Sequence, residues 1–115
     1  MANDIQFRMR VKRGEIIAVG PGKIALLEAI AGTGSISAAA RELGMSYRRA
    51  WLLIDELNHA LREPAVVTAA GGSRGGGAIL TEAGIRLIGL YRAIDASAHA
   101  AAKADIAALK RLIRD

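Results

Sequence analysis

Hydrophobic and polar residues alternate near the start of the chain. The odd-numbered positions from Ile5 to Val11 are apolar, and the even-numbered positions between them are polar. A period of two residues is typical of a β-strand with one buried face. A turn at Gly14 and a second short strand up to Val19 complete the pattern, so residues 5–19 are predicted to form an N-terminal β-hairpin.

Residues 20–22 read Gly-Pro-Gly and interrupt the strand pattern. The apolar residues after this break have the spacing of a helix. Ile24, Leu27 and Ile30 recur at intervals of three, which is the spacing of one helix face. A Gly-Thr-Gly run at residues 32–34 is expected to end this first helix, because glycine interrupts regular structure.

Two further helices are predicted from their capping residues. Ser37 is expected to cap a short helix, and Gly44 is expected to end it in the left-handed conformation. Ser46 is expected to cap the next helix, which runs to about Leu61. Residues 37–61 therefore form a predicted helix-turn-helix.

A glycine-tipped hairpin comes next. Residues 66–68 and 78–80 have the character of short strands, and the segment between them is rich in glycine. This hairpin, residues 66–80, is the predicted wing. Thr81 then caps a C-terminal helical region, residues 82–113, whose alanine-rich middle leaves open whether it is one helix or two.

This order of elements predicts a mainly α fold with small β structure, a winged helix-turn-helix with a long C-terminal dimerisation helix. The 115 residues suffice for a single domain spanning 1–115. Hydrophobic residues make up 52% and aromatic residues 3%, so the core must be aliphatic and rich in alanine.

The formal net charge is +5 and the isoelectric point is about 10.2, which suits a polyanionic partner such as nucleic acid. Cysteine is absent, which excludes disulfides and thiolate metal sites. The charged N-terminus lacks a signal-peptide core, and no apolar run approaches the roughly 20 residues that cross a bilayer. A cytoplasmic protein without a membrane partner is expected.

The helix beginning after Ser46 is the predicted recognition helix. Ala50, Ile54 and Leu57 give it one buried face, which leaves its N-terminal turn exposed. A helix held in this way enters the major groove with its first residues on base edges. Arg48 and Arg49 suit this role, since a guanidinium donates two hydrogen bonds to guanine or binds a phosphate.

Other residues of the motif leave alternatives open. Tyr47 and Trp51 contact sugar-phosphate or a thymine methyl in one interpretation and pack on the first helix in the other. Ser46 is a cap whose hydroxyl also suits a phosphate. In the wing, Arg74 suits the negative potential of the minor groove. A nucleotide-binding loop is excluded because Gly77 is not followed by lysine and a helix.

Catalytic and metal-binding patterns are missing from the sequence. His59 and His99 lack metal-ligand spacing, and Asp55 and Glu56 have the character of a solvated helix face. No nucleophile, base and orienting residue can be assembled. The prediction is a protein that is not an enzyme and has no cofactor or metal.

The sequence closely resembles the N-terminal DNA-binding domain of the ModE family of molybdate-responsive regulators. The resemblance rests on residues 32–40, 44–51, 71–78 and 80–84, including the run Ser-Tyr-Arg-Arg-Ala-Trp, and it extends over roughly residues 5–95. The same region is also similar to the winged helix of LysR-type regulators. The resemblance implies a homodimer, a recognition helix at residues 46–61 and the wing. The complete set of predicted DNA-binding residues is Ser35, Ser46, Tyr47, Arg48, Arg49, Trp51, Ser73 and Arg74.

In that family molybdate binds in separate C-terminal β-domains, which these 115 residues do not include, so the small-molecule effector stays open. The leading hypothesis is a homodimeric, sequence-specific regulator that binds double-stranded DNA. One alternative is a protein-interaction module that uses the N-terminal hairpin and the apolar helix. Another is a sensor that binds a small oxyanion through Arg8, Arg10 or Lys12.

Overall fold

A computed structural model describes residues 3–69 and 77–114 of the chain. The fold is mainly α with two small antiparallel hairpins, in the winged helix order predicted from the sequence. The elements are β1 (Val11–Arg13), β2 (Ile16–Val19), α1 (Pro21–Thr33), α2 (Ile36–Glu42), α3 (Tyr47–Ala60), β3 (Val66–Thr68), β4 (Ala78–Leu80), α4 (Glu82–Ala101) and α5 (Lys103–Lys110).

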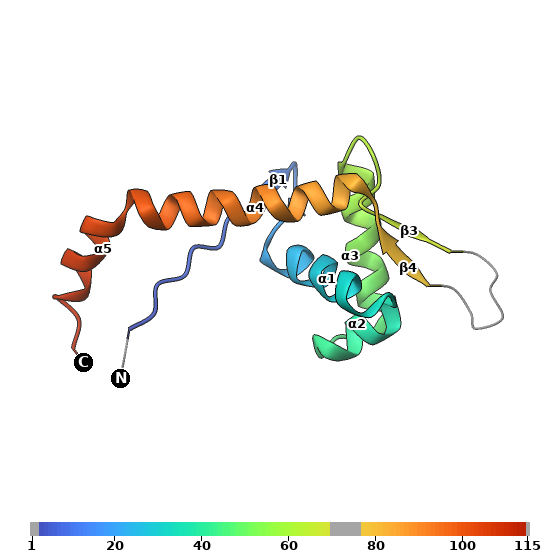
Figure 1. Ribbon diagram of the computed structural model, residues 1–115, viewed down its shortest axis with the longest axis horizontal. Coiled ribbons are helices and arrows are strands. Elements are labelled where there is room, and N and C mark those ends of the chain that lie inside the picture. Colours follow the sequence, from blue (N-terminus) through green and yellow to red (C-terminus); the bar gives the residue numbers. More distant parts are fainter. Residues whose placement is uncertain (1–2, 70–76, 115) are drawn as a thin grey trace.

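The molecule is elongated because α4 extends beyond the other helices (Figure 1). Its principal extents are 57 × 31 × 25 Å and its radius of gyration is 17.0 Å. A compact chain of this length would have a radius of gyration of about 13 Å. Helices α1 to α3 and the two hairpins form a compact body at one end, and the distal half of α4 leads away from it to α5.

The N-terminal hairpin is shorter than predicted. Its strands pair antiparallel, with Arg13 opposite Ile16, and Gly14 makes the turn with a φ of 64°. The prediction that the first strand begins at Ile5 is wrong, because strand β1 begins only at Val11. The preceding segment instead runs along α4, where it has no neighbouring strand with which to form a hydrogen-bonded ladder.

Helix α1 forms the centre of the core, as predicted. Ile24, Leu27 and Ile30 are all buried. The helix ends at Gly34, which takes the left-handed conformation with a φ of 70° and donates its N–H to the Ile30 carbonyl at 2.7 Å.

The prediction that Ser37 caps α2 is wrong, because the helix begins at Ile36 and its N-cap is Ser35. The Ser35 hydroxyl accepts a hydrogen bond of 3.1 Å from the N–H of Ala38. Starting the helix at Ile36 places that side chain in the core, whereas Ser37 lies exposed in the first turn. The predicted end of the helix is confirmed, since Gly44 has a φ of 68°.

The wing is held to the body by backbone and side-chain hydrogen bonds. Strands β3 and β4 pair antiparallel, with Val67 opposite Ile79. The N–H of Ala78 donates to the carbonyl of Gly34 at 3.0 Å, which links the wing to the turn between α1 and α2. Thr81 caps α4 as predicted, by accepting a hydrogen bond from the N–H of Gly84 at 3.1 Å.

The C-terminal helical region is two helices. Helix α4 ends at Ala101, Ala102 is the cap between the two helices, and α5 ends at Lys110, so the predicted helical region 82–113 is slightly too long. Within the described residues, no helix is both long and apolar enough to span a membrane. The division of the chain into a single domain stays a prediction.

Candidate nucleic-acid interface

The N-terminal turn of α3 is exposed, as the sequence predicts. Ser46 is the N-cap, and its hydroxyl accepts a hydrogen bond of 3.1 Å from the N–H of Arg49. Ala50, Ile54 and Leu57 are buried and fix the opposite face of the helix against the core. The first turn of α3 is therefore held in place by the buried face of the same helix, and its own side chains are accessible to a partner.

The side chains of this turn are accessible. Tyr47 is 55% exposed, and Arg48 and Arg49 are both exposed. Within residues 3–69 and 77–114, no ion pair involves either arginine. The first N–H groups of a helix and its macrodipole also attract anions. The turn therefore combines two guanidinium groups with a helix terminus suited to a phosphate.

Tyr47 and Trp51 lie in contact on the same side of α3. Their ring centroids are 6.2 Å apart, and the rings meet edge to face at 79°. Trp51 is half-buried and packs against the core, whereas Tyr47 is mostly outside it. Trp51 therefore lies between the core and the ring of Tyr47, and contact of either ring with DNA stays a prediction.

Ser35 lies close to the wing in space. It follows Gly34, whose carbonyl receives the N–H of the wing residue Ala78. The Ser35 hydroxyl is occupied by the cap of α2, and the residue is half-buried. The fold thus places the start of α2 beside the base of the wing.

The other two predicted contact residues, Ser73 and Arg74, lie outside the described residues. The described part of the wing ends where the N–H of Ala69 donates to the carbonyl of Gly77 at 2.8 Å. The positions of both predicted side chains stay predictions.

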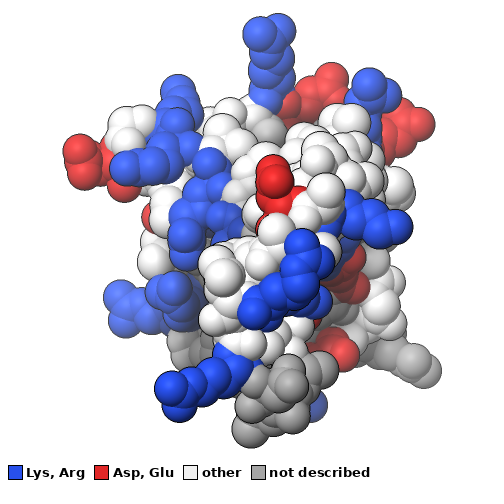
Figure 2. Space-filling view, turned by 90° about the vertical axis from the view of Figure 1, so that its left-hand side faces the viewer, with Lys and Arg blue, Asp and Glu red and all other residues white. Residues whose placement is uncertain are grey.

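Basic side chains of the described residues are scattered over the face of the molecule at the α5 end and do not form one separate patch there (Figure 2). In the view from the α5 end of the long axis, basic side chains cover much of the face, with acidic side chains between and around them (Figure 2). The net charge of +5 therefore does not by itself locate a nucleic-acid interface. The candidate interface is instead the exposed first turn of α3 together with the adjoining base of the wing.

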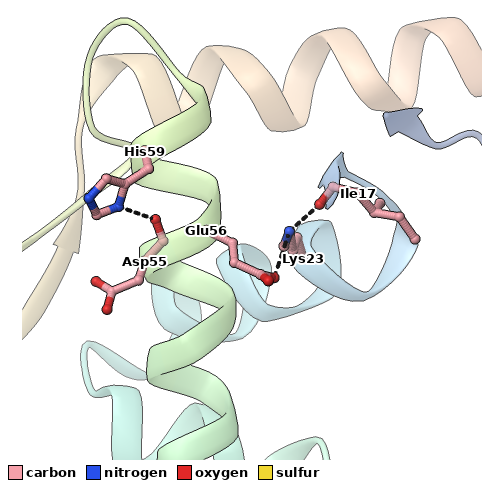
Figure 3. A network of polar contacts seen from close by, with 5 residues as sticks. All are labelled: Ile17, Lys23, Asp55, Glu56 and His59. Carbon is pink, nitrogen blue, oxygen red and sulfur yellow. Dashed lines mark hydrogen bonds and ion pairs between the residues drawn. The ribbon is translucent and has the colours of Figure 1, made fainter. Parts of the chain in front are cut away.

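Sequence reasoning missed two polar side chains that hold α3 in place. The Asn58 side-chain oxygen accepts a hydrogen bond of 2.8 Å from the N–H of Ala65, and its amide nitrogen donates to the carbonyl of Val66 at 3.1 Å. Lys23, in α1, forms an ion pair of 3.1 Å with Glu56 of α3 (Figure 3). The sequence predicts that Glu56 belongs to a solvated helix face, but its carboxylate forms an ion pair with a buried lysine.

A signal for Lys23 was present in the sequence. It lies four residues before Leu27 and seven before Ile30, so it belongs to the apolar face of α1. A lysine on a buried face needs a partner of opposite charge. The identity of that partner could not be derived, because it comes from a different helix.

The histidines show no metal site. The His59 ring nitrogen Nδ1 lies 2.7 Å from the backbone carbonyl oxygen of Asp55 in the same helix. The His99 ring nitrogen Nε2 lies 3.9 Å from the Asp95 carboxylate oxygen Oδ1. No group of three or more potential metal-binding side chains occurs in the described parts of the chain.

A family match covers the helix-turn-helix and the wing. The sequence profile of the bacterial regulatory helix-turn-helix proteins of the lysR family matches residues 22–85. This segment runs from α1 through the first turn of α4 and includes α3 and both strands of the wing.

Relatives with similar sequences are regulators and molybdenum-related proteins. The chain is 54% identical over 78 residues to the molybdenum-pterin-binding protein MopB of Rhodobacter capsulatus, which covers 68% of this chain and 29% of MopB. It is 43% identical over 83 residues to the DNA-binding transcriptional dual regulator ModE of Escherichia coli K12, covering 72% of this chain and 32% of ModE. The chain thus spans less than a third of the length of these relatives.

A similar solved structure is that of ArgP from Mycobacterium tuberculosis. It has a TM-score of 0.51 and 28% sequence identity, and the match covers 75% of this chain and 31% of ArgP. The matched family and ModE are described as regulatory proteins and not as enzymes.

Proposed function

The chain belongs to the lysR family of bacterial regulatory helix-turn-helix proteins, and from this we propose that it is a transcription regulator that binds duplex DNA sequence-specifically as a homodimer. The observation that carries the proposal is the exposed first turn of α3, which holds Arg48 and Arg49 above a buried helix face. The similarity to ModE, whose name describes a DNA-binding transcriptional regulator, supports it.

In the proposed complex, the first turn of α3 enters the major groove. Arg48 and Arg49 contact guanine edges or phosphates, and Tyr47, supported by Trp51, lies against the sugar-phosphate backbone. The hydroxyl of Ser46 and the N–H groups around it receive a phosphate.

The wing completes the contact on the neighbouring minor groove. Ser35 lies at the end of α2 that adjoins the base of the wing, where it reaches the DNA backbone between the two grooves. Ser73 and Arg74 at the tip of the wing contact the minor groove, whose negative potential attracts an arginine.

The homodimer is proposed from α4. Leu90 is 50% exposed and Ile94 is 48% exposed, and they lie one turn apart on α4. A second copy of α4 would cover this apolar face. Binding to an inverted repeat requires the two α3 helices of such a dimer to lie about 34 Å apart, which is one helical turn of DNA.

The oxyanion sensor is less well supported. Arg8 lines an open hollow of about 340 Å³ together with Arg92, whose guanidinium is paired with Glu28. Asp4 and Asp95 line the same hollow, and their carboxylates would oppose an anion. The proposal therefore assigns DNA binding to this chain and assigns no effector to it.

The test is selection from a pool of random duplexes, followed by sequencing of the bound fraction. We expect an enriched inverted repeat that is lost in the double variant Arg48→Ala/Arg49→Ala. The matched control is Lys110→Ala/Arg111→Ala, which removes the same charge from the far end of the molecule, at α5.

Each outcome decides a different part of the proposal. Loss of the motif in both double variants would show a general charge effect and contradict the assignment of the arginines. A protein that binds no duplex at low salt would overturn the regulator function in favour of a protein-interaction module.

A further inference from the structure

Lys23 is a buried cation in an unfavourable position. It is 5% exposed and is the third residue of α1. The positive end of the helix macrodipole disfavours a cation in the first turn of a helix. Lysine is also rarely buried unless it is paired, so its place in the core depends on its partners.

The ammonium group of Lys23 has partners from two other elements (Figure 3). It donates a hydrogen bond to the carbonyl of Ile17 in β2. It also forms the 3.1 Å ion pair with Glu56, whose side chain is 31% exposed. One side chain therefore joins α1, the N-terminal hairpin and the recognition helix α3.

This link differs in kind from the apolar packing around it. Ala50, Ile54 and Leu57 hold α3 by contacts that have no preferred direction and that tolerate repacking. A hydrogen-bonded ion pair has a fixed donor and acceptor geometry. In some proteins, buried polar groups of this type select one arrangement of the core and add little stability.

Glu56 lies far along α3 from the turn that is proposed to contact DNA. It lies ten residues beyond Ser46, about 15 Å further along α3. Over that length, a tilt of about 10° in the helix would move its first turn by about 2.6 Å, which exceeds the tolerance of about 0.5 Å for a binding constellation.

We propose that Lys23 is a positioning residue for DNA recognition: by binding Glu56 and the Ile17 carbonyl together, it fixes the orientation of α3 relative to α1 and the N-terminal hairpin. The consequence for DNA affinity rests on the proposed function. The effect on the orientation of α3 does not, and it can be measured in the free protein.

The experiment compares the full chain with Lys23→Met/Glu56→Leu, which replaces the ion pair with apolar groups of similar size. Such replacements often leave stability unchanged. The conservative variant is Lys23→Arg, which keeps the charge and the donors. The matched control is Arg92→Met/Glu28→Leu, which removes an exposed ion pair that joins α4 to α1 and does not involve α3.

Three quantities are measured for each variant: the urea midpoint, the affinity for the selected operator, and the orientation of α3 relative to α1 from backbone residual dipolar couplings. In Lys23→Met/Glu56→Leu we expect a changed α3 orientation and at least a tenfold loss of operator affinity, with non-specific binding to unrelated duplex unchanged. Lys23→Arg should keep operator affinity within threefold, and the control should keep both the orientation and the affinity.

Unchanged dipolar couplings in α3 together with unchanged operator affinity would overturn the proposal. A loss of operator affinity that accompanies a lowered urea midpoint, without a change in the orientation of α3, would also overturn it. That result would indicate a purely structural role for Lys23. If the double variant does not fold, Glu56→Gln, which keeps an acceptor but removes the charge, gives the same comparison. If the unmodified chain binds no DNA, the proposed function fails, and the dipolar couplings still decide whether Lys23 orients α3.

Discussion

Gly84 in the first turn of α4 lies directly against the backbone of Ala65. A β-carbon added at Gly84 would be 2.3 Å from the Ala65 carbonyl oxygen. The same carbonyl accepts a hydrogen bond of 2.9 Å from the N–H of Thr81, and the Thr81 hydroxyl donates to the Pro64 carbonyl at 2.6 Å. The start of α4 is thereby fixed to the segment between α3 and the wing.

We expect Gly84→Ala to lower the free energy of unfolding by about 1 to 3 kcal/mol, because the new methyl group can be accommodated only if the backbone moves. Gly89 provides the control, since a β-carbon there would meet nothing within 4 Å. Gly89→Ala should stabilise the helix by up to about 1 kcal/mol. Urea unfolding measures both, and a neutral Gly84→Ala would contradict this packing.

The two roles of Ser46 can be separated by substitution. Ser46→Ala removes the cap of α3 and should lower the free energy of unfolding by about 1 kcal/mol. Ser46→Asp keeps a capping oxygen and should preserve stability, but its negative charge should weaken DNA binding at the proposed phosphate contact. Measurement of the urea midpoint and the operator affinity distinguishes them, and full affinity in Ser46→Asp would argue against a phosphate at this position.

Tyr91 anchors the N-terminal segment to α4. Its hydroxyl donates a hydrogen bond of 2.8 Å to the carbonyl of Met9, 82 residues away in the sequence. Tyr91→Phe keeps the buried ring and should cost about 1 kcal/mol of unfolding free energy. Proteolytic cleavage before Val11 should become faster, as mass spectrometry of the fragments can show. Equal cleavage rates in both proteins would mean that the hydrogen bond does not hold the segment.

The proposed dimer interface can be tested at Ile94. Ile94→Glu places a charge on the exposed apolar face of α4 and should convert a dimer to a monomer in sedimentation equilibrium. Ala96→Glu is the control, because Ala96 is exposed on the opposite side of the same helix. A dimer that persists in Ile94→Glu but dissociates in Ala96→Glu would place the interface on the other face.

The Glu28–Arg92 pair illustrates a contact that sequence reasoning could not reach. Arg92 Nε donates to Glu28 at 3.1 Å, and this hydrogen bond raises the pKa of Arg92 above its ordinary value. Arg92 is exposed, so the pair contributes little to stability. Neither residue is distinguished by its neighbours in the sequence, because α1 and α4 meet only in the folded chain.

Local chemistry made several elements predictable from the sequence. The cap at Ser46, the left-handed glycine at Gly44 and the buried face of α3 each depend on residues within one or two helical turns of one another. The family resemblance rests on the same short motifs. The winged helix order and the exposed turn that carries Arg48 and Arg49 therefore follow from the sequence alone.

Tertiary contacts decided the features that the sequence left open or predicted wrongly. Ser35 and Ser37 are both good caps, and the burial of Ile36 selects Ser35. The alternating residues before Val11 lie along a helix and not beside a strand. Lys23 finds its partners in β2 and α3. The physical reason is common to all three: capping and turn preferences act between neighbouring residues, whereas burial and charge pairing depend on which distant segments the fold brings together.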